Sequence, residues 1–92
     1  MKPERAEQIA ILALTWLASK GEILPVFLGA SGASADDLIG QAENPAFLGS
    51  VLEFVTMDDA WVVEFCDQNQ LKYEEPLRAR YSLPGAEAVH WT

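Results

Sequence analysis

The sequence predicts an all-α protein in which five or six short-to-medium helices form a compact orthogonal array. Apolar residues recur with helical rather than alternating spacing, and helix start and stop signals follow one another along the chain. The one candidate strand, residues 61–63, is too short and lies between helix signals. Half of the 92 residues are hydrophobic, which is enough for one core, so residues 1–92 are expected to form a single domain.

The first helix is expected from Pro3 to about Ser19. Proline suits the first helical position, and Gly21 follows the last turn, where a left-handed cap is favourable. Between residues 9 and 18 only Thr15 is polar. A helix that is apolar on nearly all sides has to be covered by others, so this helix is predicted to be the central one.

Two short helices are predicted next. The first covers Ile23–Ala30, and its apolar side chains share one face: Ile23, Leu24, Phe27 and Leu28. Ser34 and Asp37 have the spacing of a capping box. We therefore expect Ser34 to be the N-cap of a helix over Ala35–Ala42.

Three further helices complete the prediction. Asn44 and Pro45 have the types favoured at the N-cap and first position of a fourth helix, and the pattern that begins at Thr56 predicts this residue as the N-cap of a fifth. The expected inward face of the fifth helix consists of Trp61, Val62, Phe65 and Cys66. A sixth helix is expected over Tyr73–Ser82, where Leu77 and Tyr81 share a face. Residues 83–92 are expected to form a non-helical C-terminal tail.

An internal similarity indicates two related three-helix units. A shift of 38 residues superimposes a series of apolar positions, with Leu14 on Leu52, Trp16 on Phe54 and Phe27 on Phe65. Amphipathic helices share their spacing whatever their origin, so coincidence explains the pattern equally well. At the level of sequence both interpretations stay open.

The order of these segments resembles a family of small bacterial proteins catalogued as domain of unknown function 3572. The matching segments are IAILALTWLA, LPVFLGASG, SADDL, NPAFLGSVLEFV, DDAWVVEFC and LPGAEAVHWT. They are packing and turn motifs that extend over nearly the whole chain. The resemblance implies an all-α fold and a bacterial cytoplasmic setting, and it implies no activity or catalytic residue.

The charge of the chain restricts its partners. Fourteen carboxylates oppose six Lys and Arg residues, for a formal net charge of −8. Without a basic stripe we expect no nucleic-acid binding and no attraction to anionic membranes. The apolar run Ile9–Ala18 would extend only about 15 Å as a helix, too short to cross a bilayer. A basic protein is a possible partner, although acidity also simply keeps a small protein soluble.

The sequence contains no pattern typical of a catalytic, cofactor or metal site. Cys66 is the only cysteine, which excludes an intrachain disulfide and favours a reducing, cytoplasmic compartment. A dyad of Cys66 with His90 would require the tail to fold back onto a helix, and a buried thiol more often acts as a small apolar side chain. The acidic pairs at 36–37 and 58–59 are interpreted as helix caps rather than cation ligands. We expect no cofactor.

The charge of the chain and its lack of catalytic motifs favour one of the remaining function classes over the others. A small non-catalytic protein-interaction or structural module fits best. The alternatives are a small enzyme or metal-binding protein with an unrecognised site, and an acidic mimic of nucleic acid, which would need its carboxylates on one continuous face.

The candidate binding residues lie in the C-terminal tail. Val89, His90 and Trp91 form a hydrophobic, aromatic cluster. Either the tail packs on the domain near the fifth and sixth helices, which would bury Trp91, or it binds a partner.

Overall fold

The computed structural model describes residues 1–83 apart from 33 and 35, and the chain folds there into six α-helices. In chain order they are α1 (Pro3–Ala18), α2 (Leu24–Ser31), α3 (Asp37–Gln41), α4 (Pro45–Val55), α5 (Asp59–Asn69) and α6 (Glu75–Tyr81). None of the described residues forms a strand. The predicted all-α fold class is confirmed, and the expected bounds of α1, α2, α3 and α6 lie within two residues of the observed ones.

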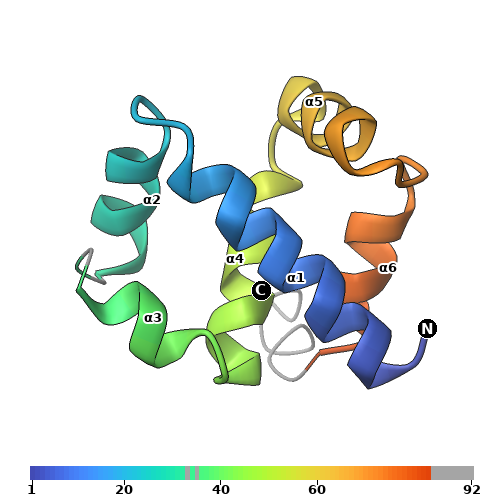
Figure 1. The fold of residues 1–92 in the computed structure, drawn as a ribbon, viewed down its shortest axis with the longest axis horizontal. Helices are drawn as coiled ribbons and strands as arrows, with labels where there is room; N and C mark the ends of the chain where they lie inside the picture. The colour runs from blue at the N-terminus through green and yellow to red at the C-terminus, as the bar shows by residue number, and fades with distance from the viewer. Residues whose placement is uncertain (33, 35, 84–92) are drawn as a thin grey trace, which may run out of the picture.

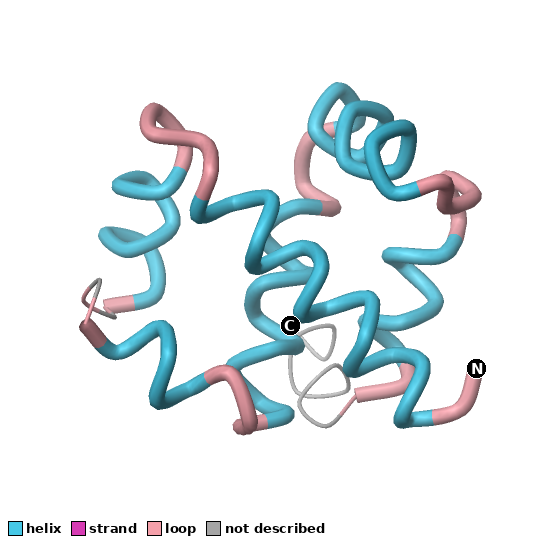
Figure 2. Tube along the Cα trace, viewed as in Figure 1, coloured by secondary structure: helices cyan, strands magenta, loops and turns pink. Residues whose placement is uncertain are grey.

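Helices α1 and α4 cross at the centre of the molecule (Figure 1). Helices α2 and α3 lie on one side of this crossing and α5 and α6 on the other, joined by short loops (Figure 2). Helix α1 packs against α4 and α6 and also contacts α5, whereas α2 packs on α4. The apolar run in the first helix therefore marks the central helix, as predicted.

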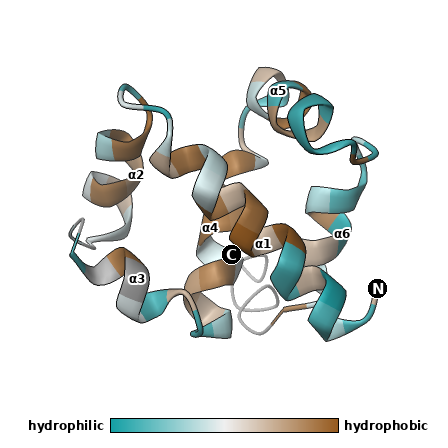
Figure 3. Ribbon diagram, in the orientation of Figure 1, coloured by the Kyte–Doolittle hydropathy of each residue, from teal (hydrophilic) through white to brown (hydrophobic). Residues whose placement is uncertain are grey.

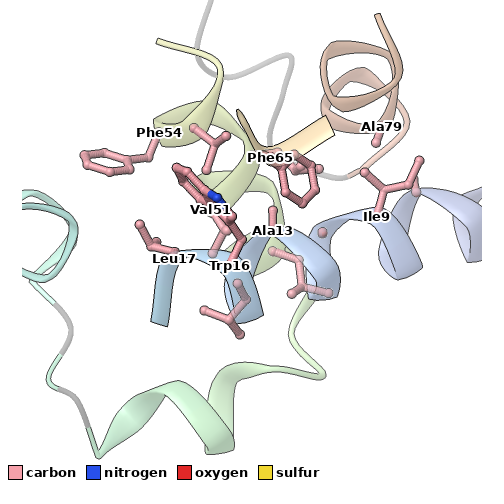
Figure 4. Packing of buried hydrophobic residues seen from close by; sticks show 14 of the residues in the cluster. Ile9, Ala13, Trp16, Leu17, Val51, Phe54, Phe65 and Ala79 are labelled. Atoms are coloured by element: carbon pink, nitrogen blue, oxygen red, sulfur yellow. The ribbon is translucent and has the colours of Figure 1, made fainter. Parts of the chain in front are cut away.

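The core surrounds this crossing, where hydrophobic residues concentrate (Figure 3). The buried residues of α1 include three alanines at helical spacing, namely Ala6, Ala10 and Ala13. Small side chains let neighbouring helices approach closely, because the distance between helix axes depends on the side chains at the contact. Ile9 of α1 and Ala79 of α6, both fully buried, face one another on this side of the core (Figure 4).

The predicted cap of α4 is confirmed. Asn44 has an extended backbone, and its side-chain oxygen accepts a hydrogen bond of 3.0 Å from the backbone N–H of Ala46. Ser34 precedes α3, which begins at Asp37, and the role of Ser34 as a cap stays a prediction.

The predicted cap of α5 is wrong. Thr56 is still in the last turn of α4, with a helical backbone (φ −76°, ψ −4°), and its hydroxyl donates a hydrogen bond of 2.8 Å to the carbonyl of Leu52. An N-cap needs an extended backbone. Asp58 has one (φ −128°, ψ 116°), and its carboxylate accepts hydrogen bonds from the N–H groups of Ala60 and Trp61 at 2.8 and 3.3 Å.

The six helices form two series of three, and the first two helices of each series pack in equivalent ways. A shift of 38 residues places α1, α2 and α3 on α4, α5 and α6 in order. Phe27 of α2 packs edge-on against Phe54 of α4, with ring centroids 5.3 Å apart. The equivalent residues one unit along, Phe65 of α5 and Trp16 of α1, also pack edge-on, at 6.1 Å. Each unit therefore packs its second helix on the first helix of the other unit.

Candidate functional site

Two faces of the predicted helices are less buried than their patterns suggest. Leu77 and Tyr81 do share a face of α6, but they are 43% and 58% exposed, and the buried residues of this helix are Pro76 and Ala79. On α5, Phe65 and Cys66 are buried, whereas the other two residues of the expected inward face, Trp61 and Val62, are half-buried.

Large hydrophobic side chains are exposed at eight described positions: Met1, Ile11, Val26, Met57, Val63, Tyr73, Leu77 and Tyr81. The most exposed purely apolar ones are Met57, at 75%, and Val26, at 57%. Isolated exposed hydrophobic residues are normal on a protein surface, whereas a group of them around a concavity marks a binding surface. The positions of these residues on the fold therefore decide which of them can mark a binding surface.

A hollow opens between α2 and α4, which we call the α2–α4 hollow. Its lining residues are Phe27, Ala30, Ser31, Ser50, Glu53, Phe54 and Met57. Its volume is about 170 Å³. Small-molecule pockets usually measure about 300–1,000 Å³, whereas a cavity of about 150 Å³ accommodates a benzene ring. The α2–α4 hollow is therefore large enough for one side chain and too small for most cofactors.

The α2–α4 hollow has a counterpart in the other half of the molecule, the α1–α5 hollow. It is lined by Leu12, Thr15, Trp16, Ser19, Gln68 and Asn69, and its volume is about 190 Å³. Each of these positions falls on a lining residue of the α2–α4 hollow after the shift of 38 residues. The two hollows are thus equivalent in position and similar in size, so their chemistry can be compared directly.

Three polar side chains that line the α1–α5 hollow, those of Thr15, Ser19 and Asn69, have hydrogen-bond partners within the domain. The hydroxyl of Thr15 donates to the carbonyl of Ile11, and the hydroxyl of Ser19 donates to that of Trp16. The side-chain amide of Asn69 donates to the carbonyl of Phe65. These three side chains need no outside partner to complete their hydrogen bonds.

The rim of the α1–α5 hollow also carries a polar cluster. Glu64 Oε2 accepts a hydrogen bond of 3.0 Å from Trp16 Nε1 and lies 2.6 Å from Lys20 Nζ. The ammonium group also lies 5.6 Å from the centre of the Trp16 ring. The hydrogen bond from Lys20 is the main cause that lowers the pKa of Glu64 below its ordinary value of 4.5. These contacts fasten α5 to α1.

Apolar side chains replace polar ones at three of the equivalent positions around the α2–α4 hollow, whereas Ser50 stands in place of Leu12 and Ser31 in place of Asn69. Met57 replaces Ser19, Ala30 replaces Gln68, and Val26 replaces Glu64. Val26 and Ala30 are one helical turn apart and both exposed, so they extend the apolar surface along α2, which Figure 3 shows as largely hydrophobic. We call Val26, Ala30, Glu53, Phe54 and Met57 together the α2–α4 surface.

Glu53 is the charged residue of this surface, and it takes the position of Thr15. Its side chain is half-buried, and no Lys or Arg lines the α2–α4 hollow. Within the described part of the chain the carboxylate of Glu53 has neither a hydrogen-bond donor nor an ion-pair partner. It differs in this respect from Glu64, which binds both Trp16 and Lys20.

A second exposed group consists of Leu77 and Tyr81 of α6 and Tyr73, which precedes this helix. The hydroxyl of Tyr73 donates a hydrogen bond of 2.8 Å to Asp67, which raises the pKa of this tyrosine. The guanidinium of Arg80 lies 5.4 Å from the centre of the Tyr81 ring. Because both rings have polar partners inside the domain, this group is a weaker candidate for a binding surface.

Cys66 is not prepared for nucleophilic chemistry. The side chain is fully buried, and its Sγ lies 3.5 Å from the carbonyl oxygen of Lys72. Burial, followed by the nearby carboxylates of Glu75 and Asp67, raises the pKa of the thiol to about 11. A nucleophilic cysteine needs its thiolate form, which is scarce at neutral pH with such a pKa.

Several expectations concern residues beyond the described range. Val89, His90 and Trp91, the predicted site residues, lie outside the described residues, as does the proposed partner of Cys66. Among the residues that the structure describes, His, Cys, Asp and Glu side chains do not gather in threes or more where a metal ion could be held. The helices in that part of the chain are also too short or too polar to cross a membrane.

The described helices define a small all-α domain with two equivalent hollows, one of them bordered by the exposed residues Val26 and Met57. The chain belongs to the family described as "Protein of unknown function (DUF3572)", whose model matches residues 3–86. This match includes all six described helices and confirms the resemblance that the sequence motifs indicated. Searches of curated proteins and of solved structures return no match.

Proposed function

We propose that this chain is a small non-catalytic protein-interaction module and that the α2–α4 surface binds its partner. One observation carries the proposal: Val26 and Met57 are exposed beside the α2–α4 hollow, whereas the equivalent residues beside the α1–α5 hollow, Glu64 and Ser19, have hydrogen-bond partners within the domain. Burial of such side chains would contribute about 25 cal/mol per Å² of apolar surface. Methionine suits this role, because its flexible side chain adapts to the shape of a partner.

The proposed partner is a basic protein. The net charge of −8 attracts cationic partners over distances of about a Debye length. The carboxylate of Glu53, which has no ion-pair partner among the described residues, favours a positive group at the contact itself. The single cysteine and the resemblance to small bacterial proteins support action in the bacterial cytoplasm.

The experiment is site-specific photocrosslinking of the full chain in its native cells. A photoreactive amino acid replaces Met57 in one version, Ser19 in a second and Leu77 in a third. Ser19 is the matched control, because it is the counterpart of Met57 at the α1–α5 hollow. We expect a defined adduct with a basic protein from position 57 and much less from the other two.

The same partner is then tested against surface variants. Met57→Asp is expected to abolish its capture, whereas Ser19→Asp and Leu77→Asp leave capture intact. Because Met57 is 75% exposed, this substitution should change the melting temperature little. An adduct from position 77 alone would move the binding surface to α6. A folded chain without an adduct from any position would contradict the interaction function.

A further inference from the structure

The position of Glu53 indicates what enters the α2–α4 hollow. A half-buried carboxylate beside Phe54 and Met57 loses part of its contact with water and gains no counter-ion in the described part of the chain. The equivalent residue of the α1–α5 hollow, Thr15, needs no counter-ion, since its hydroxyl donates a hydrogen bond to a carbonyl of its own helix. The missing complement at the α2–α4 hollow is therefore a cation.

We propose that the α2–α4 hollow binds one lysine or arginine side chain from a basic, amphipathic segment of the partner. This inference rests on the proposed function and specifies the contact at its centre. Lysine and arginine combine an apolar stem with a charged head. The stem packs on Met57 and Phe54 in a volume that fits one side chain, and the head reaches the carboxylate of Glu53.

The lining of the hollow selects this side chain over the alternatives. An acidic side chain or a phosphate would meet Glu53 as a like charge, with no lysine or arginine in the lining to offset it. A neutral aliphatic side chain would fill the hollow but leave the carboxylate without a partner and partly desolvated. A basic side chain satisfies the apolar wall and the carboxylate together. Beside it, the apolar residues of the same segment would cover Val26 and Ala30.

Side-chain analogues test this contact without the partner protein. The full chain carries only two methionines, so ¹³C labelling of the methionine methyl groups gives one signal at the hollow, from Met57, and one internal reference, from Met1. The probes are n-butylguanidinium, n-butylammonium, 1-butanol and butyrate. We expect the two cations to shift the Met57 signal saturably, and to bind about two- to five-fold tighter than 1-butanol, the range of a solvent-accessible ion pair. Butyrate should bind most weakly.

Two variants distinguish the effect of the Glu53 charge on binding from the effect of the net charge of the chain. Glu53→Gln removes the charge at the hollow, and Glu4→Gln removes one charge from the first turn of α1. The advantage of the cations over 1-butanol is expected to vanish in the first variant and to persist in the second. Glu53→Thr, which copies the residue of the α1–α5 hollow, should behave like Glu53→Gln. Thermal melts of all variants check that each remains folded.

The outcomes distinguish this inference from the proposed function. If 1-butanol binds as tightly as the cations and Glu53→Gln has no effect, the hollow is a purely apolar contact. The inference is then overturned, while a crosslink at position 57 still supports an interaction module. If no probe moves the Met57 signal, the hollow does not accept a side chain and the inference also fails. A crosslinked partner whose contacting segment lacks lysine and arginine would overturn it independently.

Discussion

Phe65 fastens α5 to the central helix, and its truncation tests how the two halves of the molecule hold together. The side chain is fully buried, and its ring packs edge-on against Trp16 at an interplanar angle of 61°. Removal of a buried phenylalanine side chain costs about 3–5 kcal/mol. A domain of this size has a total stability of about 5–15 kcal/mol, so Phe65→Ala should lose a large share of it. Phe65→Leu, which keeps most of the volume, should lose about 1 kcal/mol with the aromatic contact.

Urea denaturation followed by circular dichroism measures these free energies of unfolding. Val63→Ala is the control, because Val63 lies on the same helix but is 41% exposed, and its loss should stay within about 0.5 kcal/mol. The dependence of the free energy on urea should keep its slope in all variants, since the surface exposed on unfolding hardly changes. A loss below about 1 kcal/mol for Phe65→Ala, or equal losses at positions 63 and 65, would refute the assigned role of Phe65.

Three further predictions concern the caps, the thiol and the carboxylate of α5. Asp58→Ala should cost about 1 kcal/mol, because it removes the N-cap of α5, whereas Thr56→Ala should cost clearly less in the same denaturation assay. Equal costs would contradict the assignment of Asp58 as the cap. Because burial raises its pKa to about 11, Cys66 should react with a thiol reagent at pH 8 far more slowly in the folded chain than in urea. Rapid reaction in the folded chain would show that the thiol is accessible. The pKa of Glu64 is lowered chiefly by Lys20, so its contribution to stability should be complete above pH 4.5 and be lost as the pH falls through the lower folded value. Thermal melts of Glu64→Gln across this pH range should lack that loss of stability. If the variant loses as much stability at low pH as the unaltered chain does, the prediction is refuted.

Most of the fold could be predicted because helix signals act locally. Proline at residues 3 and 45 and asparagine at 44 act on the turn in which they stand, and the structure has helix starts at these points. The cap of α5 could not be predicted in this way. Only three residues separate α4 from α5, so Thr56 and Asp58 both fitted the capping pattern. The backbone of α4 decided between them, since it continues in helical form through Thr56.

The candidate surface could not be predicted, because two distant segments form it. Residues 26–31 of α2 and residues 50–57 at the end of α4 are brought together by tertiary packing, which includes the contact of Phe27 with Phe54. Periodicity assigned Phe27 to the core correctly, at 1% exposure. The signal that could have found the surface is the sequence LPVFLGAS itself. A helix of eight residues that is apolar on nearly all sides buries one face against its neighbour, so the apolar residues of its other face stay exposed.

The structure adds evidence about the internal similarity that the sequence alone does not contain. Coincident spacing would align apolar residues along the chain, but it would not bring the pairs Phe27–Phe54 and Trp16–Phe65 into equivalent edge-on contacts. Nor would it produce two hollows whose lining positions correspond. Because the lining positions of the two hollows correspond, the requirements of the fold alone do not explain why Met57 stands where Ser19 stands in the other half. The difference between the two hollows therefore favours a role in binding for the α2–α4 surface.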